Sequence, residues 1–359
     1  MCSSDLAART SWCRRAQWSA VTESIPPEQS TTTFMPRSYA ETGSDSRQFS
    51  GRGGQIAFAD HSRMPSLTAM VIVHDPRCTG YHTPGHPERP QRVAATEERL
   101  LRRHPAWTWR TPAPAAEADL LRAHAPAHLE RLSRGPDFDA DTSFHPEILA
   151  HARLATGAAL AALELALDRG EKAFSVMRPP GHHATRNRAM GFCYLNHIAV
   201  AALAARARGV ERVAVWDFDA HHGNGTEAIL DGRAGILFAS VHDGAGYPGT
   251  GRADTANCRN WPLPFNVDRA AHLAALEASW ASVLAFRPDL VLVSAGFDAD
   301  GEDPITQMNL AGEDFATLGR WLRESGRPTA ALLEGGYSDH LPELIDGFLC
   351  GWNGPDDPS

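Results

Sequence analysis

Two carboxylates, two imidazoles and a carboxamide are concentrated in one short segment near the middle of the chain. The segment reads Trp216-Asp217-Phe218-Asp219-Ala220-His221-His222-Gly223-Asn224-Gly225-Thr226. The apolar residues 213–216 before it predict a buried strand, and alternation along an extended backbone sends Asp217, Asp219 and His221 to one side. Asp219 and His221 could then bind one cation. Their oxygen and imidazole ligands suit zinc, iron, manganese or cobalt, whereas a hydrogen-bonded turn is the alternative interpretation.

Three further polar clusters each follow a short apolar run that predicts a strand. The clusters are Arg178-Pro179-Pro180-Gly181-His182-His183-Ala184, Gly296-Phe297-Asp298-Ala299-Asp300 and Glu334-Gly335-Gly336-Tyr337. Taken singly, they could be loop histidines, a helix N-cap and a turn. Because the carboxyl ends of parallel strands meet at the edge of a sheet where ligands bind, the clusters together indicate an active site.

Asp298 would complete a metal shell with Asp219 and His221. Three protein ligands leave an open position for water and substrate, which is typical of a catalytic metal. A metal in such a site lowers the pKa of its water toward ~7 and thereby supplies a nucleophile.

The reaction also needs a base, and the tandem His182 and His183 can supply one. Two adjacent imidazoles repel when both are protonated, so their surroundings must differ. A carboxylate such as Asp217 beside one of them favours imidazolium, whereas the amide of Asn224 leaves the other neutral and the better base. Tyr337 offers a hydroxyl donor to an oxyanion.

Alternating helical and strand patterns predict the fold from residue 70 onward. Helical periodicity covers about 90–103, 146–168, 196–208, 270–285 and 312–324, and apolar runs cover 70–74, 173–177, 212–218, 236–241, 290–294 and 330–333. The pattern predicts an α/β fold with a single domain, in which helices flank a mostly parallel central sheet. With 359 residues and 43% hydrophobic content, the chain can bury a large core.

Composition limits the partners and the location of the chain. A net charge of −9 without a basic run argues against nucleic-acid binding, and no apolar run reaches the roughly 18 residues of a membrane span. The six cysteines form no C-x-x-C pair, which favours a reducing, cytoplasmic location. We expect residues 1–66 to be a disordered or mis-annotated extension, 67–350 to be the catalytic domain, and 351–359 to be a flexible tail.

The four motifs, together with Gly191-Phe192-Cys193-Tyr194, resemble the zinc-dependent histone deacetylase superfamily. The resemblance runs in the family's order from residue 70 to about 347. Asn224 and the Glu334-Gly-Gly-Tyr run look like its class II branch, which includes bacterial deacetylase-like amidohydrolases and acetylpolyamine amidohydrolases. The resemblance implies an enzyme that removes acetyl or other acyl groups from lysine side chains of proteins and peptides, or from related amines.

The resemblance also implies cofactors and roles for individual residues. One zinc ion per chain would be held by Asp219, His221 and Asp298, and a structural potassium ion would lie near Asp217, Asp219, His221 and Ser240. The implied catalytic residues are His183 as the main base and acid, His182 paired with Asp217 as its electrostatic partner, Asn224, and Tyr337, which would polarise the amide carbonyl.

Five residues are expected to bind the substrate: Gly191, Phe192, Tyr247, Asp141 and Ile305. The first three would wall a tunnel for the acyl-lysine stem, and Asp141 would bind the substrate backbone. Ile305 follows Asp303-Pro304, where some polyamine-specific relatives carry a glutamate. The apolar residue favours acyl-lysine, while the nearby Glu302 keeps acetylpolyamines as an alternative.

Two other functions compete with this one. Residues 297–304 also resemble the aspartate-rich motif of binuclear manganese ureohydrolases, but those enzymes need an aspartate where this chain has Gly223, and they lack a donor like Tyr337. A non-catalytic acyl-lysine-binding module would have no need of the complete set of catalytic groups. The sequence makes no prediction of oligomeric state.

Overall fold

The centre of the molecule is a single sheet of parallel strands. The computed structural model describes residues 70–354. Within them the sheet has eight strands in the order β2-β1-β3-β8-β7-β4-β5-β6, and all neighbouring strands pair in parallel. The strands are β1 (Val71–Val73), β2 (Thr108–Arg110), β3 (Ala173–Ser175), β4 (Val213–Asp217), β5 (Ile236–Asp243), β6 (Cys258–Leu263), β7 (Leu290–Ala295) and β8 (Thr329–Leu333). The predicted parallel α/β fold is confirmed.

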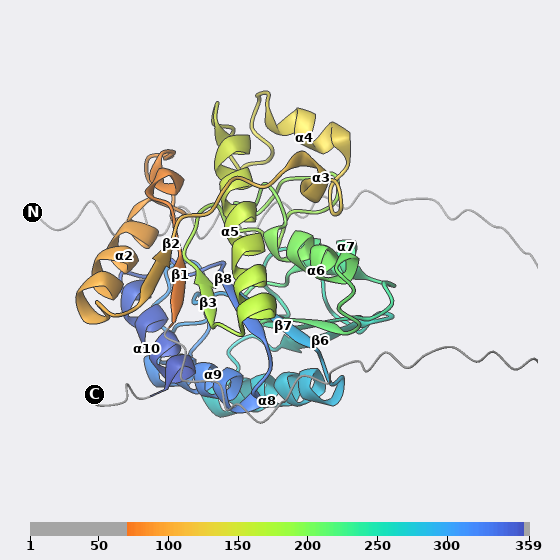
Figure 1. Cartoon of the computed structure of the whole chain (residues 1–359). Helices are drawn as coiled ribbons and strands as arrows, with labels where there is room; N and C mark the ends of the chain where they lie inside the picture. Colours follow the sequence, from red (N-terminus) through yellow and green to blue (C-terminus); the bar gives the residue numbers. More distant parts are fainter. Residues whose placement is uncertain (1–69, 355–359) are drawn as a thin grey trace, which may run out of the picture. The chain divides into compact units, whose positions relative to one another are not determined.

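Helices cover both faces of this sheet (Figure 1). The α5 and α6 helices pack on one face of the sheet, against β3, β8, β4 and β7. Helix α8 packs against β4, β5 and β6, and α10 packs against both α9 and α2. The helices are α2 (Gln91–Arg103), α3 (Glu117–Leu120), α4 (Pro126–Leu132), α5 (Ile148–Arg169), α6 (His197–Ala207), α7 (Asn224–Leu230), α8 (Arg269–Ala285), α9 (Gly312–Ser325) and α10 (Leu341–Asn353), with a short 3-10 helix η1 (Pro76–Thr79).

Aromatic side chains of the strands pack against aromatic side chains of the neighbouring helices. Trp216 of β4 is fully buried; its ring lies 4.8 Å from Trp280 of α8, and its indole N–H donates to Ser279 Oγ at 2.9 Å. Phe348 of α10 packs 6.1 Å from Phe174 of β3. Such contacts make the strand ends rigid supports for the loops that follow them.

Helix α5 is long and apolar enough to cross a membrane by length and composition alone. In its most apolar 18-residue stretch, however, 67% of the helix is buried inside the protein. Ala155, Ala158 and Ala162 of α5 are buried and belong to the main apolar core. We therefore interpret α5 as a core helix.

Several elements differ from the sequence expectation. The strands β2 and β6 and the helices α3, α4, α7 and α10 were not predicted from the sequence, and Asn224 is the first residue of α7. The last helix runs to Asn353, past the expected end of the catalytic domain at residue 350. The expected extension, residues 1–66, and most of the expected tail lie outside the described residues.

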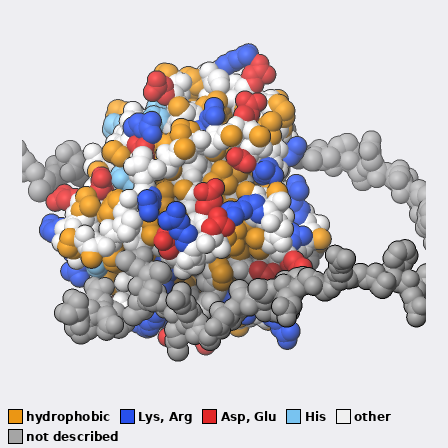
Figure 2. All heavy atoms as spheres, in the orientation of Figure 1, with side chains coloured by type: hydrophobic (Ala, Val, Ile, Leu, Met, Phe, Trp, Pro, Cys, Tyr) orange, Lys and Arg blue, Asp and Glu red, His pale blue; other side chains and the backbone are white. Residues whose placement is uncertain are grey.

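Charged side chains of both signs are interspersed over the described surface in Figure 2. Several form exposed pairs, as Arg269 does with Glu313. Exposed pairs of this kind contribute little to stability. The fold is therefore held mainly by its apolar core, which continues beneath the site.

Candidate metal and catalytic site

The four polar clusters meet at one edge of the sheet. They follow β3, β8, β7 and β4, which are consecutive neighbours in the middle of the sheet. Because all four strands run in the same direction, their carboxyl ends deliver the clusters to one place. The expectation of a shared edge is confirmed.

Three donor atoms converge there in a geometry that could hold a metal ion. His221 Nδ1 lies 2.8 Å from Asp298 Oδ2 and 3.2 Å from Asp219 Oδ1. The ligand atoms of the three residues all lie within 4.8 Å of one another. Both carboxylates are fully buried, so a cation is the natural partner for their charge.

Backbone amides bond the other oxygen of each carboxylate and so orient the converging oxygens toward the metal position. Gly335 N–H donates to Asp219 Oδ2 at 2.8 Å, and Ala220 N–H donates to Asp298 Oδ1 at 2.9 Å. A Cβ at residue 335 would lie 2.3 Å from Asp298 Oδ2, and one at Gly296 would lie 2.1 Å from Asp219 Oδ2. Only glycine leaves room for both carboxylates, so the pocket is shaped around this donor set.

The mechanism that brings Asp219 and His221 together differs from the alternation proposed from sequence. Strand β4 ends at Asp217, so the two ligands lie beyond the regular strand. Asp217 Oδ1 instead accepts from Asp219 N–H at 3.1 Å, and Asp219 Oδ1 accepts from His221 N–H at 2.9 Å. These side-chain-to-backbone bonds, two residues apart, turn the chain so that both ligands face the site.

The tandem histidines have the unlike partners that were expected. His182 Nδ1 lies 3.1 Å from Asp217 Oδ2, whereas His183 Nδ1 lies 2.8 Å from Asn224 Oδ1. Burial opposes charge on His182, but Asp219 and Asp217 outweigh it and raise its pKa to about 10. Burial, followed by the charges of His182 and His221, holds the pKa of His183 well below its usual value. One imidazole is therefore charged and its neighbour neutral at neutral pH.

Glu334 is a buried part of the site to which the sequence reasoning gave no role. Its carboxylate accepts from Gly181 N–H at 2.6 Å and from His182 N–H at 3.1 Å, and Ser294 Oγ donates to it at 3.2 Å. Burial raises the pKa of Glu334 to about 7. Glu334 thus connects the loop after β8 to the loop after β3 that carries the two histidines. In the sequence, its position directly before Gly335-Gly336 was the feature that could have indicated this role.

Tyr337 enters the site with an uncommitted hydroxyl. Its side chain is only 6% exposed, yet the hydroxyl makes no hydrogen bond to any residue in 70–354. The residue is fixed by other groups: its N–H donates to Asp303 Oδ2 at 2.7 Å, and the Arg92 guanidinium lies 4.6 Å from its ring centre. Arg92 also donates to Gly336 O at 2.6 Å. The hydroxyl is thus positioned and available to a ligand.

Aromatic side chains wall the approach to the histidines. The Tyr247 ring packs edge-on to His183 at 5.0 Å, and Phe192 packs edge-on to Tyr337 at 5.7 Å. Gly191 lies between them with φ of 56°, and a Cβ there would lie 2.5 Å from His183 Cδ2. Glycine is therefore required where this wall touches the base.

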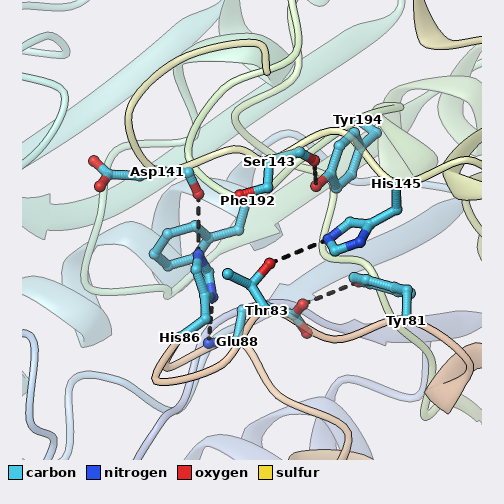
Figure 3. Close-up of a pocket in the computed structure, with 9 residues that line it drawn as sticks. All are labelled: Tyr81, Thr83, His86, Glu88, Asp141, Ser143, His145, Phe192 and Tyr194. Atoms are coloured by element: carbon cyan, nitrogen blue, oxygen red, sulfur yellow. Dashed lines mark hydrogen bonds between the residues drawn. The ribbon is translucent and has the colours of Figure 1, made fainter. Parts of the chain in front are cut away.

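The remaining two substrate-binding candidates, Asp141 and Ile305, form hydrogen bonds with loop residues. Asp141 accepts through its backbone oxygen from His86 Nε2 at 3.1 Å, and its carboxylate points away from the other residues drawn in Figure 3. Ile305 is half-buried, and its N–H donates to Asp303 Oδ1 at 3.0 Å. Asp141 lies in the loop between α4 and α5, whereas Ile305 lies in the loop after β7 that also carries Asp298.

A buried ion pair supports the first loop behind this wall. Arg178 contacts Glu88 through two hydrogen bonds of 2.5 and 2.7 Å, and Tyr81 Oη donates to Glu88 Oε2 at 3.0 Å. Tyr81 and Glu88 line a small enclosed cavity with His86 and Phe192 (Figure 3). No role for Glu88 or Arg178 was predicted, because the two residues are 90 positions apart in the sequence and no local pattern indicates that they pair.

Comparisons with known proteins agree on one family. The histone deacetylase domain matches residues 86–349. A probable deacetylase from Methanothermobacter thermautotrophicus is 38% identical over 292 residues, covering 77% of this chain and 87% of that protein. A histone deacetylase-like amidohydrolase from Pseudomonas aeruginosa is 40% identical over 251 residues, covering 64% of this chain and 66% of that protein. The crystal structure of acetylpolyamine aminohydrolase from Burkholderia pseudomallei has a TM-score of 0.70 at 27% identity, covering 79% of this chain and 98% of that one. With this fold and this arrangement of strand-end residues, the chain belongs to the histone deacetylase family and is a hydrolase of the deacetylase type.

Proposed function

We propose that this chain is a zinc-dependent amidohydrolase that removes acetyl or other acyl groups from lysine side chains or related amines. Asp219, His221 and Asp298 would hold one zinc ion, and the catalytic domain would span residues 67–350. The observation that carries the proposal is the pair of unlike histidines beside the three-donor cluster. A merely structural metal site has no need of a neutral base and a charged neighbour.

When bound, zinc would polarise the amide carbonyl and bring the pKa of water near neutrality. The chain's own residues would do the rest. Asn224 Oδ1 accepts from His183 Nδ1–H, so Nε2 carries the lone pair that accepts a proton from the attacking water and later passes one to the departing amine. His182, kept charged by Asp217, and the Tyr337 hydroxyl would stabilise the negative charge that develops on the carbonyl oxygen.

The substrate we propose is an acyl-lysine on a protein or peptide. Phe192 and Tyr247 offer apolar faces to a straight aliphatic stem. The residue after Asp303-Pro304 is the apolar Ile305, where a glutamate would favour a polyamine. Acetylpolyamines are the second candidate, supported by the structural similarity to an acetylpolyamine aminohydrolase. Glu302 at 3.4 Å from His340 is an exposed acid that could meet a second ammonium.

Other parts of the proposal concern ions and location. Ser240 lies opposite Asp217 in the β4–β5 register, where the structural potassium ion would bind. The described cysteines, Cys78, Cys193, Cys258 and Cys350, form no disulfide, which fits a reducing, cytoplasmic location. We propose neither nucleic acid nor membrane as a partner.

The ureohydrolase alternative conflicts with the space at Gly223. A Cβ at residue 223 would lie 2.3 Å from Asp217 Oδ2. An aspartate that bridges two metals from this position would therefore displace the Asp217 carboxylate. The non-catalytic alternative is opposed by the neutral His183 and by the Tyr337 hydroxyl, which makes no hydrogen bond to another residue of 70–354.

The test is an activity panel on one zinc-loaded preparation. An acetyl-lysine peptide, an acetylated polyamine and longer acyl-lysines are compared, with metal content measured in parallel. We expect one catalytic metal and turnover of the acetyl-lysine peptide, with loss of activity in His183→Ala. A variant activity within about threefold of wild type contradicts the mechanism, because loss of transition-state charge stabilisation should cost far more. Tight zinc without turnover of any substrate indicates the binding module.

A further inference from the structure

A second cluster of metal-ligand side chains lies at the far end of α2, outside the catalytic site. His104 caps the carboxyl end of α2, and Asp346 and Cys350 lie one turn apart on α10. His104 Nε2 is 2.6 Å from Asp346 Oδ1 and 3.7 Å from Cys350 Sγ, and Sγ is 3.5 Å from Asp346 Oδ1. The ligand atoms of the three residues lie within 4.8 Å of one another.

These side chains are held in place by their neighbours. Residues four apart on a helix share one face, so Asp346 and Cys350 project together. The His104 ring stacks on Trp107 with centres 3.8 Å apart and planes 6° from parallel. Two rigid elements thus supply a donor triad that needs little ordering to bind an ion.

The Asp346 carboxylate divides its two oxygens between different partners. Asp346 Oδ2 accepts from Arg99 Nε and Arg103 Nε, each at 2.8 Å, whereas Oδ1 faces His104 and Cys350. Ligating carboxylates in metal sites are commonly oriented by a second partner in this way. The guanidiniums would also offset the negative charge of a thiolate and a carboxylate around one cation.

Two residues of the triad line a hollow in the described part of the chain. Asp346 and Cys350 line a hollow of about 620 Å³ between α2, α9 and α10. Arg320 and Arg323 of α9 also line it. An ion bound by the triad could therefore take a water molecule or a small anion as its fourth ligand.

We propose that His104, Asp346 and Cys350 form a second metal site, which takes zinc or a similar borderline cation. The Sγ separations of 3.5 and 3.7 Å fit the ligand-to-ligand distances of a tetrahedron with roughly 2.3 Å metal–sulfur and 2.0 Å metal–nitrogen bonds. The 2.6 Å contact between His104 and Asp346 must lengthen as the metal replaces their hydrogen bond. The thiol loses its proton to solvent as the metal–sulfur bond forms. His104 gives up the Nε2 proton of that hydrogen bond and carries its remaining proton on Nδ1, so that the Nε2 lone pair can bind the metal.

The competing interpretation is a metal-free brace between α2 and α10. In that case the cluster is a hydrogen-bonded ion-pair network with Arg99 and Arg103, and the Cys350 thiol keeps its proton and binds no metal. The two interpretations differ in one spectroscopic property. The catalytic cluster of Asp219, His221 and Asp298 has no thiolate. Of the two clusters found within residues 70–354, the second is therefore the one that can give a thiolate-to-metal charge-transfer band.

The experiment is a Co²⁺ titration of the purified, metal-free full-length chain. We expect about two equivalents to bind, with a near-ultraviolet thiolate-to-cobalt band that follows one of them. Cys350→Ser should lose the band and one equivalent while keeping the other equivalent and the hydrolase activity. Cys258→Ser is the matched control. It should keep both cobalt equivalents and the thiolate band, since burial raises the pKa of the Cys258 thiol to about 12.

Two results overturn the proposal. The first is a wild-type chain that binds Co²⁺ without any thiolate band, which needs no variant to interpret. The second is a band that persists in Cys350→Ser, which assigns it to another cysteine. Thermal unfolding gives an independent readout: the second equivalent should raise the unfolding midpoint of wild type but not of Cys350→Ser. Loss of hydrolase activity plays no part in either outcome, so failure here is distinct from failure of the proposed function.

Discussion

Replacing Tyr337 by phenylalanine removes one hydroxyl from the site and little else. The hydroxyl makes no hydrogen bond to the described residues, so no internal partner is left unsatisfied. The ring contacts that position the side chain, to Phe192 at 5.7 Å and to Arg92 at 4.6 Å, are available to phenylalanine as well. The backbone bond to Asp303 is independent of the side chain. The substitution therefore isolates the proposed donor to the oxyanion.

The expected loss is large in rate and small in stability. Removing one preorganised oxyanion donor costs about 10²–10³ in kcat, or roughly 2.7–4 kcal/mol of barrier. KM should change little, because the hydrogen bond strengthens only as charge develops. The free energy of unfolding should stay within about 0.5 kcal/mol of wild type. Steady-state kinetics on an acetyl-lysine peptide and denaturant unfolding of the same preparation measure both quantities.

Tyr81→Phe is the matched control for this experiment. The Tyr81 hydroxyl donates to Glu88 at 3.0 Å in a buried structural network. Its removal should cost about 1 kcal/mol of stability and leave kcat nearly unchanged. The reasoning is refuted if Tyr337→Phe retains kcat within about threefold of wild type, or if its rate loss is matched by an equal loss of stability.

Three other predictions concern charge at and behind the site. Asn224→Asp places a carboxylate 2.8 Å from His183 Nδ1 and should raise the pKa of His183; the acidic limb of the kcat/KM profile should move to higher pH, and an unmoved limb contradicts the assignment. The Arg178 pair outweighs burial and lowers the pKa of Glu88 to about 2. Its contribution to stability is full above the ordinary glutamate pKa of about 4.5 and is lost as pH falls toward 2. The free energy of unfolding of Glu88→Gln should thus be lower than that of wild type by up to roughly 3–5 kcal/mol at neutral pH. Denaturant unfolding at several pH values should show this difference becoming smaller in acid, and a difference that does not depend on pH contradicts the role of the Glu88 charge. Removal of metal by a chelator should abolish activity and lower the unfolding midpoint, and equimolar zinc should restore both; activity that survives a verified metal-free state rules out the metal role.

Sequence patterns predicted the central elements but not the peripheral ones, for identifiable reasons. Strand β2 is a three-residue edge strand whose outer residues are exposed, so it has no apolar run to detect. Helix α10 contains Gly347 and Gly351, which weaken helical propensity. In the fold, a Cβ at Gly351 would lie 2.1 Å from Ala316 O of α9. Packing of α10 on α9 therefore stabilises a helix whose local propensity is poor.

The sequence alone determined which side chains could do the chemistry. Residue type fixes ligand chemistry, and the apolar run before each cluster places it at a strand end, so Asp219, His221 and Asp298 could be grouped without coordinates. Only the tertiary structure decided how these groups are supported. Glu334 holds the amide of His182, and Arg92 donates to the carbonyl of Gly336, across long stretches of chain. The protonation states of the ionisable groups in the site depend on burial and on distances between residues that are far apart in the chain. Local sequence determines neither of these quantities.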